Sequence, residues 1–195
     1  MARKLEFDKA QALQKGMRLF WEKGYETSSL EDLVQAMEIN RFSIYNTFGD
    51  KKALLLMTLK HYRESVLARL IAPLKADLPA EACLENYFTN MSQQLSSSSG
   101  SLGCFIQRTG QSHIASEPEV ADLLLSMLVE LRSALTSVVR RAKEEKTISG
   151  HYEDEIIVDF ILGQIQGLIV LRRSGKKLVS IERQIELLKE TVLRW

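Results

Sequence analysis

The sequence predicts an all-α protein of about nine helices. Apolar residues recur every three or four positions along the chain, and no stretch shows the sustained apolar-polar alternation that is typical of a strand. Only three prolines interrupt the 195 residues. With 45% apolar residues the chain is able to bury a core, either as one large domain or as two small ones.

The first three predicted helices are close together in the sequence. The first covers about 7–23 and ends before Gly24, a residue that favours a left-handed C-terminal cap. Ser28 and Glu31 have the spacing of a capping box at the start of a short second helix. A third helix is expected over 41–48. Two short helices joined by a tight turn are a candidate helix-turn-helix.

The remaining predicted helices are mostly longer. Asp50 is expected to cap a helix over 51–71, which is long enough to join two domains. Pro79 suits the first turn of the next helix, which ends at a loop rich in serine and glycine. Ser116 and Glu119 have the spacing of a second capping box. Further helices are expected over 102–115, 120–146, 153–172 and 180–194.

Composition and charge narrow the class of protein. No apolar run approaches the roughly 20 residues that span a bilayer, and the first residues lack a signal-peptide core, so we expect a cytoplasmic protein without a membrane partner. The net charge of +1 argues against indiscriminate nucleic-acid binding but leaves room for a local DNA-reading surface. Cys83 and Cys104 stand apart and are interpreted as reduced thiols, with no metal site or cofactor expected.

An enzyme is disfavoured by the motifs that the sequence lacks. It contains no nucleophile elbow, no phosphate-binding glycine loop, and no H-E-x-x-H motif among its three histidines. The sequence therefore predicts a protein that is not an enzyme. A helical dimerisation protein without DNA binding stays open beside a DNA-binding regulator.

Two segments of the chain resemble the DNA-binding domain of the TetR (tetracycline repressor) family. They are residues 24–30, GYETSSL, and residues 39–55, INRFSIYNTFGDKKALL. The resemblance implies a DNA-binding domain at 1–50 and a ligand-binding and dimerisation domain at 51–195. It also implies a homodimer that occupies a palindromic operator of double-stranded DNA and is released by an unknown small-molecule or electrophile effector. A repressor is expected, with an activator as the alternative.

The same resemblance assigns residues to the DNA-binding surface. They are Ser28, Arg41, Phe42, Ser43, Tyr45, Asn46, Thr47 and Lys51. Arg41 begins the recognition helix, where a guanidinium can contact a guanine edge or a phosphate, although a solvated arginine is the alternative. Ser28 is expected to cap the second helix or hold a phosphate, and Lys51 to meet another phosphate.

Two residues depart from the family pattern. Glu38 stands where the family usually has a glycine in the turn, and a positive φ there would cost about 1 kcal/mol. Phe42 replaces a residue that is usually small in the recognition helix. If exposed, Phe42 is able to contact a thymine methyl group or a sugar. Both departures concern the local geometry of the helix-turn-helix.

Less specific patterns suggest an effector pocket and a dimer interface. The candidate pocket residues are polar or soft side chains on otherwise apolar helices: Tyr62, Tyr87, Met91, Gln94, Cys104, Gln107, Thr109, Gln111 and His113. The interface candidates lie on the last two helices: Phe160, Gly163, Ile165, Gly167, Ile181, Ile185, Leu188 and Val192. Burial inside one subunit is the alternative for these helices.

Cys104 supports a second hypothesis about the effector. It follows Gly103 at the start of a predicted helix, where backbone N–H dipoles would lower the pKa of a thiol and make it reactive toward electrophiles. Some TetR-family sensors respond through a cysteine at this place. A small thiol that packs in the core is the alternative.

Overall fold

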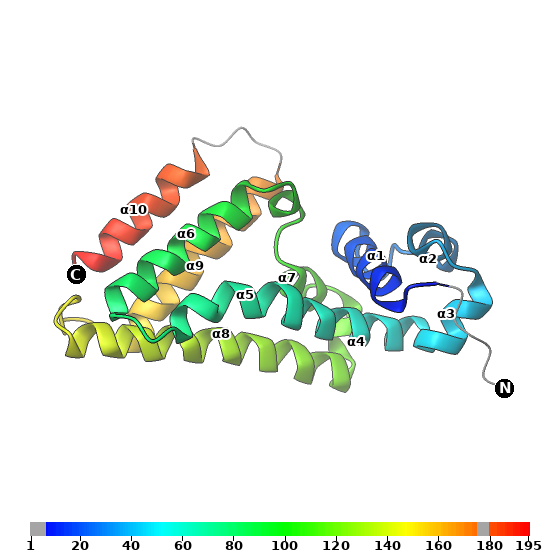
Figure 1. Cartoon of the computed structure of the whole chain (residues 1–195), viewed down its shortest axis with the longest axis horizontal. Coiled ribbons are helices and arrows are strands. Elements are labelled where there is room, and N and C mark those ends of the chain that lie inside the picture. Colours follow the sequence, from blue (N-terminus) through cyan, green and yellow to red (C-terminus); the bar gives the residue numbers. More distant parts are fainter. Residues whose placement is uncertain (1–6, 175–179) are drawn as a thin grey trace. The chain divides into compact units, whose positions relative to one another are not determined.

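The computed structural model describes residues 7–174 and 180–195, which are helical and contain no strand. The α-helices are α1 (Lys9–Lys23), α2 (Leu30–Met37), α3 (Arg41–Phe48), α4 (Lys51–Tyr62), α5 (Ala68–Ile71), α6 (Ala80–Ser96), α7 (Phe105–Gly110), α8 (Pro118–Glu144), α9 (Asp154–Arg173) and α10 (Ile181–Leu193) (Figure 1). A π-helical turn, η1 (Arg63–Leu67), makes α4 and α5 one continuous helix. Counted so, the described residues form nine helices, which confirms the prediction.

The chain divides into two compact units. The first comprises the described residues up to Ser65 together with Cys104–Met127, and the second comprises Val66–Gly103 and the described residues from Leu128 onward. None of the helices in the described ranges is both long and apolar enough to cross a membrane. The expected functional division at residue 50 stays a prediction.

Local capping explains where the helices of the first unit begin. The side chains of Asp8, Ser29, Asn40 and Asp50 each accept a hydrogen bond from a backbone N–H in the first turn of the helix that follows. These caps satisfy donors that have no partner inside the helix. The core that α1 to α4 share contains side chains that are at most 1% exposed: Phe20, Leu33, Ile44, Phe48, Leu54 and Leu55.

Both predicted capping boxes are wrong. The second helix is capped by Ser29, whose hydroxyl accepts from the Asp32 N–H while the Asp32 carboxylate accepts from the Ser29 N–H. At the second place, the Ser116 hydroxyl donates to the His113 carbonyl, within the short 3₁₀ turn η4 (His113–Ser116). Ser29 and Asp32 have the same three-residue spacing as Ser28 and Glu31, so spacing alone does not choose between them.

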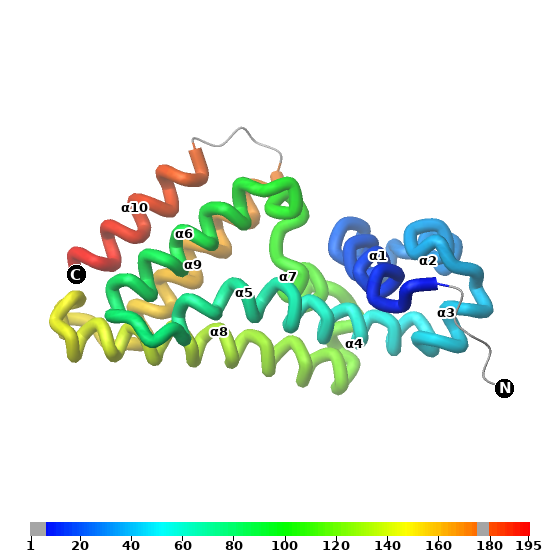
Figure 2. The backbone as a smooth tube through the Cα atoms, viewed as in Figure 1, coloured from blue at the N-terminus to red at the C-terminus, as the bar shows by residue number. Residues whose placement is uncertain are grey.

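The second unit packs α10 against α6 and α9, as the tube view makes plain (Figure 2). Five predicted interface residues are buried inside this unit: Ile165, Ile181, Ile185, Leu188 and Val192. They are at most 6% exposed, so they stabilise the subunit itself. The prediction that these five residues contact a second subunit is therefore corrected. Gly163 and Gly167 are exposed, and Phe160 is half-buried.

Candidate DNA-binding surface

The helix-turn-helix presents one face of α3 to solvent. Arg41, Phe42, Tyr45 and Asn46 are exposed, with Phe42 70% exposed, whereas Ile44 is 1% exposed. The Arg41 guanidinium lies 5.8 Å from the ring centre of Tyr45, one turn further along the helix. Adjacent cationic, aromatic and amide side chains on one exposed helix face are suited to reading base edges in a major groove.

Three further candidates lie at the border of this face. Ser43, Thr47 and Lys51 are half-buried. The Lys51 ammonium lies 4.4 Å from the ring centre of Tyr25, and burial lowers the pKa of this lysine. Its position in the first turn of α4 agrees with a contact to the DNA backbone, which stays a prediction.

Ser28 neither caps α2 nor lies on the DNA-binding surface, contrary to what the sequence suggested. Its side chain is 0% exposed, and its hydroxyl donates to the Gly24 carbonyl at 2.5 Å. A buried hydroxyl that is already paired cannot reach a phosphate from this position, so we correct the predicted DNA contact of Ser28. The neighbouring Ser29, which caps α2, is exposed instead.

Glu38 adopts the left-handed conformation that its place in the turn demands. Its φ is 57° and its ψ is 34°, and it ends α2 as the C-cap. The carboxylate forms an ion pair of 2.5 Å with Lys15 on α1. Because the Glu38 side chain is 72% exposed, the pair offsets only a small part of the backbone strain.

Replacing Glu38 by glycine is expected to raise the free energy of unfolding by about 1 kcal/mol, because glycine has no Cβ to oppose a positive φ. Urea denaturation measures the difference. Glu38→Ala is the matched control, since it removes the ion pair and keeps the strain, and it should not stabilise the protein. An equal gain in both variants would contradict the role of backbone strain.

The capping box at the start of α2 makes stability depend on pH. Hydrogen bonds from Lys23 and Ser29 lower the pKa of Asp32 from 3.8 to about 2. A carboxyl whose pKa is lower in the folded state stabilises it above the unfolded pKa, and this contribution is lost as the pH falls through about 2. Asp32→Asn should therefore lower Tm at pH 6, and its difference from the wild type should shrink between about pH 4 and pH 2. A difference that is independent of pH would contradict this cause.

The predicted effector residues fall into both compact units. Tyr62, Cys104, Gln107, Thr109, Gln111 and His113 belong to the first unit, whereas Tyr87, Met91 and Gln94 belong to the second. Gln111 and His113 are exposed and are therefore unsuited to lining an enclosed pocket. Tyr87 is 0% exposed, and its hydroxyl has no hydrogen-bond partner among the described residues.

Cys104 lies in a different environment from the one expected. Its thiol shares a hydrogen bond with the buried Tyr62 hydroxyl. Burial raises the pKa of the thiol, and the N–H groups of Gln107 and Ile106 offset this only in part. The predicted lowering of the pKa of Cys104 is therefore wrong, because desolvation outweighs the dipoles of the short helix.

The sequence analysis did not single out two side chains that have notable surroundings in the structure. Arg108 lies against Gly24, and the side-chain oxygen of Gln166 is buried without a hydrogen-bond partner in the described residues. No local pattern singles out Arg108, because its contacts come from a distant helix. Gln166 had one signal, its amide in an apolar run.

The geometry of α1 to α3, with a buried core and an exposed recognition helix, defines a DNA-binding protein of the helix-turn-helix class. The family model described as bacterial regulatory proteins, tetR family, matches residues 12–57. An uncharacterized HTH-type transcriptional regulator, YezE of Bacillus subtilis (strain 168), is 30% identical over 154 residues, which cover 79% of this chain and 79% of YezE. The chain belongs to the TetR family of transcription regulators.

Two further similarities extend over nearly the whole chain. The HTH-type transcriptional repressor ComR of Escherichia coli (strain K12) is 27% identical over 190 residues, covering 97% of this chain and 89% of ComR. A solved structure of a cysteine mutant of the TetR-family regulator CifR, complexed with 26-bp operator DNA, has a TM-score of 0.83 and 25% identity, and covers 99% of this chain and 100% of its own. The family is one of DNA-binding regulators, so the expectation that this protein is not an enzyme is confirmed.

Proposed function

We propose that this regulator is a repressor, which binds a palindromic operator as a homodimer in the cytoplasm and leaves it when an effector binds. The observation that carries the proposal is the exposed face of α3, formed by Arg41, Phe42, Tyr45 and Asn46. In a two-fold dimer, two such helices enter successive major grooves. ComR, which is named a repressor, and CifR, whose structure contains operator DNA, support this proposal by similarity.

Selection of bound duplexes from random double-stranded DNA tests this function. The expected result is a palindrome whose half-site centres lie about 10 bp apart, or a multiple of that distance. Failure to enrich any sequence would favour a helical dimerisation protein that does not bind DNA. A promoter that carries the selected site then distinguishes the two modes of regulation, because a repressor lowers its transcription and an activator raises it.

The homodimer is proposed from an apolar seam on the exposed face of α9. The seam consists of Ile156, Phe160, Gly163, Gly167 and Val170. Their spacings of four and three residues align them along one side of a helix. Ile156 is 55% exposed and Val170 is 54% exposed, while a Cβ added at either glycine would meet nothing within 4 Å. Small residues between exposed apolar ones let a partner helix approach closely.

Sedimentation equilibrium tests whether this seam joins two copies. Ile156→Arg should convert the dimer into monomers, because it places a charge within an apolar contact, at the end of the seam. Leu125→Arg is the matched control, since Leu125 is 60% exposed on α8 and lies outside the seam. Loss of the dimer in both variants, or in neither, would contradict the assignment.

A small effector with a polar group is proposed to bind near Tyr87 in the second unit. Burial raises the pKa of Tyr87, and its hydroxyl lacks a partner within the described part of the chain. A buried unpaired hydroxyl is costly, and a bound molecule that accepts its hydrogen bond would remove that cost. Mass spectrometry of small molecules that copurify with the wild type, but not with Tyr87→Phe, tests this site.

An electrophile that modifies Cys104 is the alternative effector. The burial of the thiol and its hydrogen bond to Tyr62 favour a packing role at neutral pH, because the reactive thiolate is disfavoured there. Modification would nevertheless break the Tyr62 contact inside the DNA-binding unit. Unchanged DNA affinity after stoichiometric alkylation of Cys104 would contradict this alternative.

A further inference from the structure

Residues 105–117 form a segment that contacts several parts of the helix-turn-helix; we call this segment the clasp. It comprises α7, the turn η4 and Glu117. The clasp belongs to the same compact unit as α1–α4, although it follows them by more than forty positions in the sequence. In this unit α7 packs against α1 and α4.

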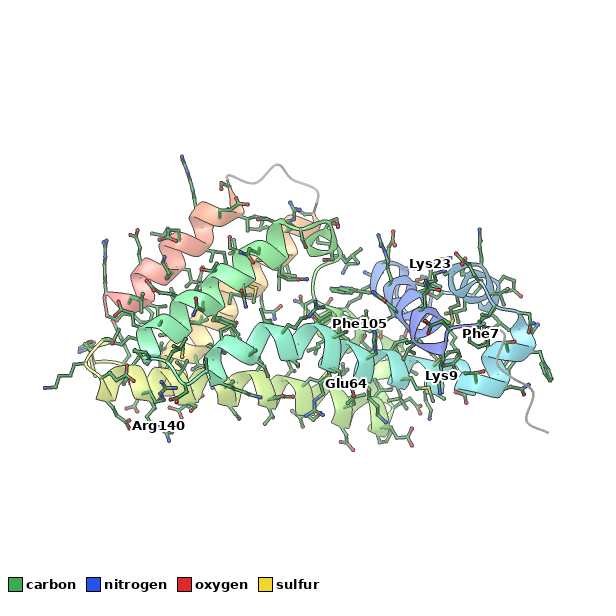
Figure 3. All side chains as sticks on the ribbon, in the orientation of Figure 1. Phe7, Lys9, Lys23, Glu64, Phe105 and Arg140 are labelled. Carbon is green, nitrogen blue, oxygen red and sulfur yellow. The ribbon has the colours of Figure 1, made fainter. Side chains whose placement is uncertain are left out.

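An aromatic contact fixes the start of the clasp. Phe105 is labelled in Figure 3. Its ring stacks on Trp21 of α1, with centroids 6.1 Å apart, and packs edge-on against Tyr62 of α4, with centroids 5.6 Å apart. Trp21 and Tyr62 also touch each other, at 5.1 Å. Phe105 is 1% exposed, so the first residue of the clasp is part of the buried core of this unit.

Arg108 places its guanidinium at the carboxyl end of α1. A Cβ added at Gly24 would lie 3.2 Å from Nη2 and 3.5 Å from Nε of Arg108. Gly24 is the C-cap of α1, with φ of 92°, and the carbonyl groups at this end carry partial negative charge. Arg108 is half-buried, and its Nε has no hydrogen-bond partner in the described residues. A cation at this end of α1 interacts favourably with the helix dipole.

Two polar contacts join the clasp to the α1–α2 turn and to α4. The Glu26 carboxylate, just before α2, accepts a hydrogen bond of 3.2 Å from the Ile114 N–H. Lys52, in the first turn of α4, forms an ion pair of 3.1 Å with Glu117, and the Glu117 carboxylate raises the pKa of this lysine. The clasp thus contacts the α1–α2 turn and the start of α4.

These contacts are made to elements that adjoin the recognition helix, because α3 itself packs on α2 and α4. We propose that Arg108, with Glu26 and Glu117, is a positioning residue for operator binding. It holds the α1–α2 turn and α4 in the arrangement that presents α3, without contacting DNA. This inference rests on the proposed DNA binding and adds the residues that orient the recognition helix α3.

The test compares Arg108→Ala and Arg108→Lys with the wild-type full chain on the duplex that the wild type selects. Kd is measured over a range of salt concentrations, at a temperature where thermal unfolding shows each variant to be folded. Arg108→Ala should raise Kd by about 3- to 30-fold. Arg108→Lys keeps the positive charge at the end of α1 and should restore part of the affinity.

The salt dependence separates positioning from direct contact. If Arg108 only positions α3, the slope of log K against log salt concentration stays at its wild-type value, whereas loss of a phosphate contact would reduce the slope by about 1. Arg183→Ala removes an exposed arginine of α10 and should leave both quantities unchanged.

Three outcomes would overturn the proposal or its basis. An unchanged Kd for folded Arg108→Ala would contradict the positioning role while leaving the proposed function intact. A raised Kd with a smaller salt slope would make Arg108 a phosphate contact. If the wild type itself selects no duplex, the proposed function fails first.

Discussion

Replacing Arg41 by alanine is expected to weaken binding to the selected operator by about 1–3 kcal/mol and to relax the preference at one base pair. Arg41 is exposed in the first turn of α3, and its fork of donors matches the two acceptors on a guanine edge. Titration against duplexes that vary one base pair at a time measures both effects.

Lys51→Ala is the matched control for Arg41→Ala, because Lys51 begins α4 and is expected to contact the backbone alone. Its loss should weaken all duplexes alike and reduce the salt slope by about 1. If Arg41→Ala also weakens every duplex to the same extent, Arg41 contacts a phosphate and does not read a base. Tyr45→Ala, measured on the same duplexes, reports whether the Tyr45 ring contacts the base pair that Arg41 contacts.

Gly100→Ala is expected to destabilise the second unit by about 3 kcal/mol. Gly100 is buried in the 3₁₀ turn after α6, where an added Cβ would overlap the Leu95 carbonyl and lie 2.6 Å from the Gln94 oxygen. Backbone atoms cannot move aside as a flexible side chain can. Chemical denaturation followed by circular dichroism measures the loss.

Gly110→Ala provides the comparison for Gly100→Ala. Gly110 is the last residue of α7, is exposed, and has nothing within 4 Å of the position of a Cβ. Alanine there should leave the free energy of unfolding unchanged or raise it by about 0.5 kcal/mol, since it lowers the conformational entropy of the unfolded chain. If the two variants unfold at the same denaturant concentration, the turn at Gly100 rearranges without cost.

The sequence predicted the helices well because their signals are local. Asp50 caps α4 as expected, Gly24 ends α1, and Glu38 takes the positive φ that its place in the turn suggested. A cap or a C-terminal glycine acts on backbone groups within four residues, so a short window of sequence contains the cause. The choice between Ser28 and Ser29 failed because both have an acidic residue three positions later.

The regular helix expected over 51–71 is interrupted by the π-helical turn at Arg63–Leu67. No proline or glycine marks this place in the sequence. The extra residue in the turn changes which side chains of the helix face inward after it. Periodicity calculated for an ideal helix therefore cannot follow the buried face past this point.

By itself, the sequence determined the class of fold and the helix-turn-helix, because helical periodicity and capping depend on near neighbours. The exposure of Phe42 on α3 was left open and was decided by the tertiary structure. Only the tertiary structure decided which apolar residues of α9 and α10 are buried and which form the open seam. It also brought Ile114 to Glu26, 88 positions apart, and Arg108 to Gly24. Such pairs depend on which helices pack together, and packing is a property of the whole compact unit, not of any one segment.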